Sequence, residues 1–272
     1  MPSSTSPRWS TTWLSTQLVE VPTRFLVQLS DPHVGATWVD EDPAAGLAAA
    51  VETARRVCPS PDAVLVSGDL SDNAADAEYE QVHELVGRIG APIYVLPGNH
   101  DRRERLRRNF DLPGEGPEPV QYAADVGSLR LVVLDTTRPG EDGGELDADR
   151  LRWLDAELSA HPDTPTLIAM HHPPVLTGIS GWDEIGLPEA DRRALGEIVA
   201  RHRHVRRLVA GHLHRTIATD FAGTSLVVVP STYVQGKLDF DAEEIQLAAE
   251  PPGFAIHAMT DGELVSHIQP VG

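Results

Sequence analysis

Short polar segments that could bind metal or move protons recur along the chain, each directly after an apolar run. In order they are Asp31-Pro32-His33, Gly68-Asp69, Gly98-Asn99-His100-Asp101, His171-His172-Pro173-Pro174 and Gly211-His212-Leu213-His214. Each has an ordinary interpretation when taken singly, because Gly-Asp and Gly-Asn favour turns and Asp-x-His or His-x-His pairs arise by chance in loops. Together they supply the carboxylate, imidazole and amide ligands that borderline divalent metals bind. The segments therefore predict a metal centre, provided that the fold brings them together.

The elements that would position these segments follow from the alternation of apolar runs with amphipathic stretches. We expect strands at Phe25–Leu29, Ala63–Val66, Ile93–Leu96, Leu129–Leu134, Thr166–Met170 and Val205–Ala210, and helices at Asp42–Val57, Asp76–Ile89, Asp147–Leu158 and Glu189–Arg203. This alternation indicates an α/β fold, in which ligands bind at the carboxyl ends of the strands. Asp42 is the expected cap of the first helix, with Pro43 at its first position.

The end of the chain differs, because strands follow one another without intervening helices. They are expected at Leu226–Val229, Phe254–Ala258 and Leu264–Ile268. A mixed sheet is therefore expected to complete a single domain over residues 24–272. We interpret residues 1–23 as a flexible N-terminal extension without the features of a secretory signal, although Trp9 and Trp13 could dock on the body or on a second subunit.

Charge and composition exclude several classes of partner. The 272 residues contain 22 Lys and Arg against 41 Asp and Glu, a formal net charge of −19. Such a chain repels nucleic acid polymers and anionic membrane surfaces. No apolar run approaches the roughly 20 residues of a membrane-spanning helix. The single cysteine, Cys58, cannot form an internal disulfide, so a cytoplasmic location is expected.

The ordered segments resemble those of the calcineurin-like metallophosphoesterase superfamily, over about Arg24 to Ile268. Within it the chain is most similar to bacterial class III cyclic nucleotide phosphodiesterases and to glycerophosphodiesterases. The resemblance implies a four-layer α-β-β-α sandwich, with two mixed β-sheets flanked by helices. It also implies hydrolysis of small phosphodiesters, with 3′,5′-cyclic nucleotides as the leading substrates, and a homo-oligomer that is a dimer or larger.

Other functions stay open at this point. A glycerophosphodiesterase is one alternative, and a broad-specificity phosphodiesterase or phosphomonoesterase is another. The alternative of a different class is a metal-binding scaffold that has kept the fold without turnover.

The resemblance implies two metal ions per chain, iron and manganese being expected and zinc or cobalt being possible. The first ion would be held by Asp31, His33 and His214, the second by Asn99, His171 and His212, with Asp69 shared by both. His171 is preferred over His172 because the family pattern is a ligand histidine, one residue, then proline. His100 matches a histidine that is not a ligand and that stabilises the transition state or protonates the leaving alkoxide.

The implied ligand set is also reasonable on physical grounds. Two ions about 3.5–4 Å apart need a shared carboxylate, and they lower the pKa of a bridging water so that hydroxide can attack phosphorus near neutral pH. Two divalent ions with Asp31, Asp69 and the hydroxide leave about one positive charge, which a diester monoanion balances.

Several nearby residues have two interpretations each. Asp72 and Asp101 either orient ligand imidazoles or cap turns. The arginines from Arg102 to Arg108 form either a solvated helix face or a guide for anions. Trp38 and Trp182 are either surfaces on which a base stacks or ordinary packing.

Overall fold

The computed structural model describes residues 23–272. The expected extension, including Trp9 and Trp13, lies almost entirely outside the described residues.

One mixed sheet is built from the two ends of the described chain. Its strands in spatial order are β13 (Glu263–Pro270), β12 (Gly253–Thr260), β1 (Arg24–Leu29), β2 (Ala63–Ser67) and β3 (Ile93–Leu96). β1, β2 and β3 run parallel, whereas β12 is antiparallel to β1. The carboxyl ends of the three parallel strands therefore lie at one edge.

The middle of the chain forms the second mixed sheet. Its strands in spatial order are β4 (Tyr122–Val126), β5 (Leu129–Val133), β6 (Thr166–Ala169), β7 (Val205–Ala210), β9 (Thr224–Val228) and β8 (Ile217–Phe221). The four central strands are parallel, and an antiparallel strand closes each edge. A short hairpin of β10 (Gln235–Gly236) and β11 (Leu247–Ala248) lies apart from both sheets.

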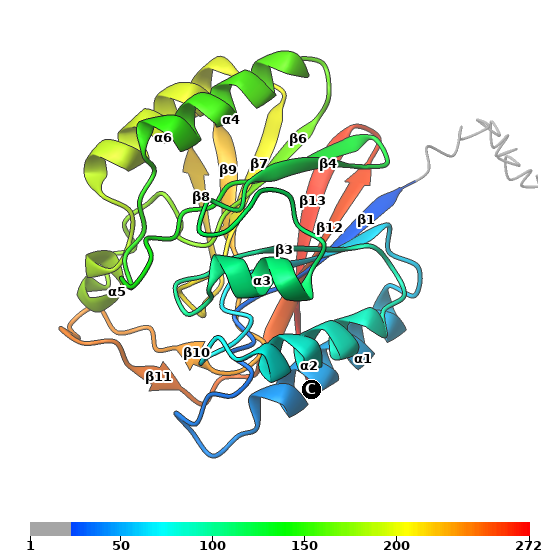
Figure 1. Ribbon diagram of the computed structural model, residues 1–272, viewed down its shortest axis with the longest axis vertical. Helices are drawn as coiled ribbons and strands as arrows, with labels where there is room; N and C mark the ends of the chain where they lie inside the picture. Colours follow the sequence, from blue (N-terminus) through cyan, green and yellow to red (C-terminus); the bar gives the residue numbers. More distant parts are fainter. Residues whose placement is uncertain (1–22) are drawn as a thin grey trace, which may run out of the picture.

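Helices cover the outer faces of the two sheets (Figure 1). The helices of the described residues are α1 (Pro43–Val57), α2 (Asp76–Gly87), α3 (Arg103–Asn109), α4 (Ala148–Ala160), α5 (Ser180–Glu184) and α6 (Glu189–Arg201). α1 and α2 pack on the five-stranded sheet, and α4 and α6 pack on the six-stranded sheet. A third apolar cluster, with Leu65, Leu131 and Val209 among its members, fills the space between the sheets. These layers confirm the expected α-β-β-α sandwich.

Most expected elements occur within a few residues of their expected bounds. Asp42 caps α1 by accepting a hydrogen bond from Ala44 N at 2.9 Å, and Pro43 occupies the first turn as expected. The late strands divide between the sheets, since β9 joins the six-stranded sheet and β12 and β13 join the five-stranded sheet. The edge strands β4 and β8, the short helix α5 and the β10–β11 hairpin were not expected, because they are short and lack a long apolar pattern. A helix was one of the two interpretations for the arginines that lie in α3.

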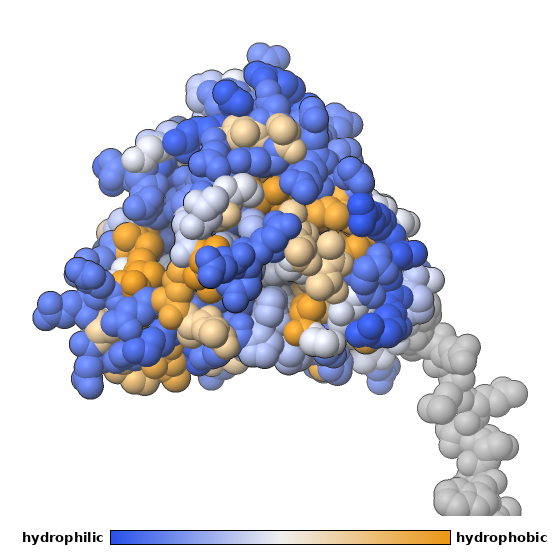
Figure 2. All heavy atoms as spheres, turned by 90° about the horizontal axis from the view of Figure 1, so that it is seen from below, coloured by the Kyte–Doolittle hydropathy of each residue, from blue (hydrophilic) through white to orange (hydrophobic). Residues whose placement is uncertain are grey.

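The surface seen from below is mostly hydrophilic, with separate hydrophobic patches between the charged groups (Figure 2). This agrees with the strongly acidic composition. Among residues 23–272, none of the helices combines the length and the apolar character needed to cross a bilayer.

Candidate metal centre

The strand ends bring the predicted residues together from both sheets. Asp31 and His33 follow β1, Asp69 follows β2, and Asn99 and His100 follow β3. From the other sheet, His171 follows β6, and His212 and His214 follow β7. All of the predicted acidic and histidine ligands are buried, and Asn99 is partly buried.

The backbone at these residues is unusual. Left-handed φ angles occur at Asp31 (49°), His33 (43°), Asp69 (48°), His212 (71°) and His214 (47°). Non-glycine residues in this region cost about 1–3 kcal/mol each and persist where the surrounding structure demands them, often at functional sites. The strained backbone therefore coincides with the predicted ligands.

A first cluster, defined as Asp31, His33, Asp69 and His214, has its ligand atoms within 4.8 Å of one another. His214 Nδ1 donates to the carbonyl of Val234 at 2.8 Å, so His214 Nε2 carries a lone pair. That lone pair faces His33 Nε2 at 3.0 Å.

The opposite nitrogen of His33 explains why these two lone pairs meet. His33 Nδ1 lies 3.4 Å from a carboxylate oxygen of Asp72, which attracts the imidazole proton to that side. His33 Nε2 then also presents a lone pair, 3.4 Å from Asp69 Oδ2. Two facing lone pairs beside a buried carboxylate fit a cation held between them.

A second cluster forms where Asn99 meets two imidazoles. His171 Nδ1 donates to the carbonyl of Ser67 at 3.0 Å, which leaves His171 Nε2 free at 3.0 Å from Asn99 Oδ1. His212 Nε2 donates to the carbonyl of Ile185 at 3.1 Å, and His212 Nδ1 lies 3.2 Å from the same Asn99 oxygen.

Asp69 joins the two clusters, because its Oδ2 lies 3.3 Å from His171 Nε2 as well as 3.4 Å from His33 Nε2. When His171 is neutral, these acceptor atoms converge without a proton between them.

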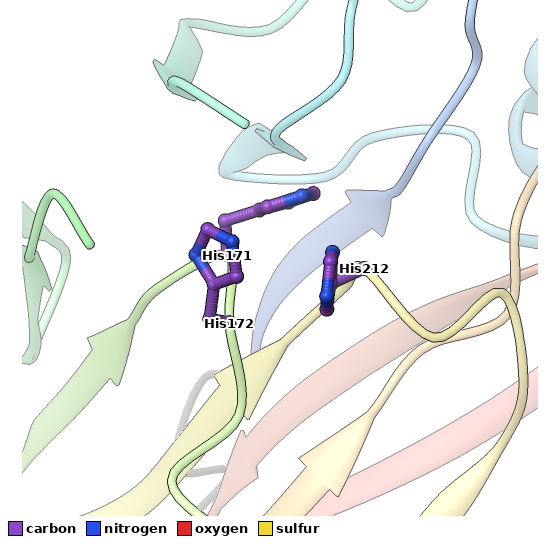
Figure 3. Close-up of side chains that lie close together, drawn as sticks. All are labelled: His171, His172 and His212. Atoms are coloured by element: carbon purple, nitrogen blue, oxygen red, sulfur yellow. The ribbon is translucent and has the colours of Figure 1, made fainter. Parts of the chain in front are cut away.

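His172 lies beside this second cluster, but both of its nitrogens have other partners. Figure 3 shows His171, His172 and His212 gathered at the ends of neighbouring strands. His172 Nε2 donates to the carbonyl of Asp142 at 3.0 Å, and His172 Nδ1 accepts from Thr136 Oγ1 at 2.9 Å. His172 nevertheless has a ligand-type nitrogen within 4.8 Å of those of His171 and His212, so the preference for His171 over His172 stays a prediction. Thr136 and Asp142 were not predicted, and no motif marks them.

The electric field of the two clusters attracts positive charge. Burial raises the pKa of Asp31 to about 6. Burial opposes ionisation of Asp69 as well, but His171 and His33 hold its pKa well below the ordinary value. Burial works against charge on His171, yet Asp69 and Asp31 raise its pKa to about 9. A site that would otherwise draw protons onto a buried imidazole fits metal cations.

His100 stands at the solvent side of the clusters, with its side chain 30% exposed. Its Nδ1 is 3.2 Å from Asp72 Oδ1, and its backbone N–H donates to Asp69 Oδ1 at 2.9 Å. Burial opposes charge on His100, but the hydrogen bond to Asp72 and the carboxylate of Asp69 raise its pKa to about 9. A protonated imidazole in this position can donate a proton to a leaving group.

The two open interpretations of Asp72 and Asp101 are now distinguished. The carboxylate of Asp72 lies 3.4 Å from His33 Nδ1 and 3.2 Å from His100 Nδ1, and although burial opposes ionisation, these two imidazoles lower its pKa to about 2. The carboxylate of Asp101 instead accepts backbone N–H groups of Leu70, Ser71 and Gly98 at 3.2, 3.3 and 2.9 Å. Asp72 therefore orients imidazoles, and Asp101 joins two loops.

The glycines beside the ligands allow close approach. A Cβ on Gly98 would lie 2.2 Å from Asp69 Oδ1. A Cβ on Gly211 would lie 2.2 Å from Ser30 Oγ and 2.7 Å from Asp31 Oδ2. Any larger residue at either position would displace a ligand carboxylate.

An open polar cleft of about 410 Å³ lies beside His100. Asn99, Arg102 and Arg105 line it together with the carboxylates of Asp72, Glu141 and Asp142. Arg103, in contrast, is buried and pairs with Asp135. The arginine segment therefore divides between the cleft and the interior.

The two tryptophans occupy different places. Trp38 is 40% exposed, and its ring lies 4.4 Å from the ring of His33 and 5.6 Å from that of His100. Trp182 is only 7% exposed and packs 5.8 Å from the ring of His212. Trp38 is thus exposed beside His33 and His100, whereas Trp182 packs in the interior beside His212.

Comparison with known proteins agrees with this geometry. The family model described as calcineurin-like phosphoesterase matches residues 26–216. The chain is 33% identical over 240 residues to a probable cyclic nucleotide phosphodiesterase of a Synechococcus strain, covering 84% of this chain and 88% of the relative. It is 30% identical over 255 residues to a probable glycerophosphodiester phosphodiesterase, GpdQ, of Arcobacter nitrofigilis, covering 91% and 93%.

The fold is shared more widely than the sequence. A dimetal phosphatase from Danio rerio superposes with a TM-score of 0.67 at 17% identity, covering 92% of this chain and 96% of the other. The strand-end residues, the sandwich and the family match over most of the chain lead to one conclusion. The chain belongs to the calcineurin-like phosphoesterase family and is an enzyme of that hydrolase class.

Proposed function

We propose that the chain is a phosphodiesterase that works with two metal ions and acts on small diesters, foremost 3′,5′-cyclic nucleotides. The first ion would bind Asp31, His33, Asp69 and His214, and the second Asp69, Asn99, His171 and His212. Iron and manganese are the proposed metals.

One observation carries the proposal, namely the facing lone pairs of the histidines in each cluster. The far nitrogens of His171, His212 and His214 each donate to a backbone carbonyl, and that of His33 lies 3.4 Å from a carboxylate oxygen of Asp72 without a hydrogen bond to it. This fixes the tautomer that leaves a bare nitrogen facing inward. Lone pairs that face one another repel when no cation lies between them, and a bound cation replaces this repulsion with attraction.

When bound, the ions would lower the pKa of water for attack on phosphorus and neutralise charge on the phosphoryl oxygens. The chain's own residues would do the rest. Asp72 holds the imidazole of His100 in place, and a protonated His100 can give its proton to the departing alkoxide. The alkoxide leaves poorly without that proton, so His100 is the proposed general acid.

The leading substrate is supported by Trp38 and by the relatives. A partly exposed indole beside His100 offers a surface on which a nucleobase can stack, and stacking is worth about 1–3 kcal/mol per base. The Synechococcus relative bears the name of a cyclic nucleotide phosphodiesterase. The second candidate, glycerophosphodiester hydrolysis, is favoured by the polar lining of the cleft and by the GpdQ relative.

A substrate panel tests these proposals. Manganese-loaded protein would be compared on cyclic AMP, cyclic GMP, 2′,3′-cyclic nucleotides, glycerophosphodiesters, an aryl diester and monoesters by kcat/KM. We expect cyclic nucleotides to rank first. A higher rank for glycerophosphodiesters would favour the second candidate.

The same preparation tests the metal centre and the scaffold alternative. Wild-type protein should hold about two ions per chain, and Asp69→Asn should lose both metal and turnover. Fewer than about one ion after manganese supplementation, with no activity on any diester, would favour a scaffold. Sedimentation of the loaded protein would test the predicted homo-oligomer.

A further inference from the structure

A row of polar side chains, all buried except for the partly buried Ser266, lies on the inner face of the five-stranded sheet, in an otherwise apolar layer. It begins at Ser266 on β13, passes through His257 on β12 and Gln28 on β1, and continues through Ser67 at the end of β2 to Ser30 and Asp31. We call these residues the polar row. Apart from Asp31, no member belongs to the sequence motifs, and the proposed chemistry uses none of the others.

The amide of Gln28 has only one orientation that satisfies its surroundings. Gln28 Nε2 lies 2.8 Å from Ser67 Oγ and 3.4 Å from the carbonyl of Ala210, which can only accept. Gln28 Oε1 therefore points to His257 Nε2, 2.8 Å away, and this nitrogen must carry the proton.

The direction of every other bond follows from that choice. His257 Nδ1 carries a lone pair and accepts from Ser266 Oγ at 2.6 Å, while Arg207 donates to the same hydroxyl. On the other side of Gln28, the oxygen of Ser67 is occupied as an acceptor. Its hydroxyl can donate to Ser30 Oγ at 2.8 Å or to the carbonyl of Leu29 at 3.3 Å, and the shorter contact favours Ser30.

The row ends on a predicted metal ligand. Ser30 Oγ accepts a hydrogen bond from Ser67, so its own hydroxyl donates to Asp31 Oδ2 at 2.5 Å. The other interactions of this carboxylate include the backbone N–H of His212, at 2.9 and 3.1 Å from its two oxygens. With Ser67 donating to Ser30, one hydrogen bond between each pair of neighbours in the row is directed toward Asp31, and bonds aligned in this way polarise one another in a low dielectric.

We propose that the polar row positions Asp31 for the first metal ion, with Gln28 setting the direction in which the serine hydroxyls donate. The inference rests on the two-ion centre proposed above. Partners behind metal ligands set their orientation and basicity, and losing such a partner typically costs 10–100-fold in metal affinity. Gln28 and His257 are positioning residues here, because they act through the serines.

The proposal predicts a loss confined to one of the two ions. Asp31 belongs only to the first cluster. His171 contacts the row through the backbone carbonyl of Ser67, and His212 through its backbone N–H to Asp31. Neither contact involves a side chain that Gln28→Met or Ser67→Ala removes. Without a donor from Gln28, Ser67 can reverse and Ser30 can donate to Ser67 instead of Asp31. Affinity for the first ion should then fall about ten-fold, while affinity for the second stays close to wild type.

The experiment is a Mn²⁺ titration of the full chain, made metal-free and followed by calorimetry and electron paramagnetic resonance. Gln28→Met keeps the length of the side chain without its hydrogen bonds. Ser67→Ala interrupts the row by removing a single oxygen, so it serves if Gln28→Met does not fold. Tyr122→Phe is the control, since it removes a hydroxyl that bridges Val95 N and O elsewhere in the same sheet interface.

The expected result is that Gln28→Met and Ser67→Ala each weaken one Mn²⁺ site about ten-fold and leave the other unchanged, with kcat on an aryl diester restored at saturating Mn²⁺. Tyr122→Phe should lower Tm without changing either affinity. His257→Gln, whose amide can replace the Nε2 donor, should keep both affinities.

Two results would overturn the inference in different ways. If wild type binds two ions and both row variants keep both affinities within two-fold, the polar row has no positioning role. If wild type binds no Mn²⁺, the two-ion centre itself is wrong, and the inference is wrong with it.

Discussion

Replacing His257 should make the stability of the protein less sensitive to acid. The His257 imidazole is 1% exposed and is neutral in its hydrogen bonds to Ser266 and Gln28. Burial, with the nearby charges of Arg207 and His267, lowers its pKa to about 3. In the unfolded chain a histidine has a pKa of about 6.5. The two states therefore bind protons differently over a wide range of pH.

The sign and size of the effect follow from this difference. Between about pH 6.5 and the folded pKa of about 3, the unfolded chain binds a proton that the folded protein does not. The contribution of His257 to the free energy of unfolding is therefore fully present above pH 6.5. It falls as the pH drops, by about 1.4 kcal/mol for each pH unit. His257 alone should lower the free energy of unfolding by about 2 kcal/mol at pH 5. The full loss, reached below pH 3, is about 5 kcal/mol.

Urea unfolding at pH 7.5 and pH 5.0 measures this contribution. His257→Gln should lose about 2 kcal/mol less than wild type between the two pH values, whatever its stability at pH 7.5. His83→Gln removes an exposed histidine on α2 and is the matched control. It should lose as much stability as wild type between the two pH values. Equal pH dependence of wild type and His257→Gln would refute the reasoning.

Three further substitutions have clear expected outcomes. His100→Ala should lower turnover on a diester by at least about 10²-fold while metal content stays at the wild-type level; parallel loss of both would place His100 among the ligands. Trp38→Leu should lower kcat/KM for cyclic AMP roughly five- to hundred-fold and leave an aliphatic diester unchanged, whereas an equal loss on both substrates would exclude stacking. Arg103→Met should destabilise the protein by about 3–5 kcal/mol in urea, because it leaves the buried carboxylate of Asp135 unpaired. Arg108→Met, which breaks only an exposed ion pair, should cost less than about 1 kcal/mol, and a similar cost for both variants would contradict the role of burial.

Elements with strong local patterns were predictable from the sequence. The apolar runs that became β1, β2, β6 and β7 are buried along most of their length, and the cap at Asp42 needs only its near neighbours. The polar segments after these strands could be placed at one edge because parallel strands end on the same side.

Other features depend on contacts that local sequence does not encode. β4, with the sequence YAADV, is an edge strand whose partner β5 determines its structure. Nothing in the spacing of Asp72 and Asp101 shows that one contacts imidazoles and the other contacts backbone N–H groups. Trp38 and Trp182 likewise differ only in what the folded chain places around them.

The sequence alone determined the chemical types of the ligands, the order of the segments that carry them and the acidic field around them. Only the tertiary structure decided which imidazole nitrogens face inward and which residues stand behind Asp31. The reason is distance along the chain: His33 and His214 meet across 181 residues, and Gln28 and His257 across 229. Such contacts form only when the chain packs into its tertiary structure. The sequence pattern therefore predicts a metal centre, but only the packing determines its hydrogen bonds.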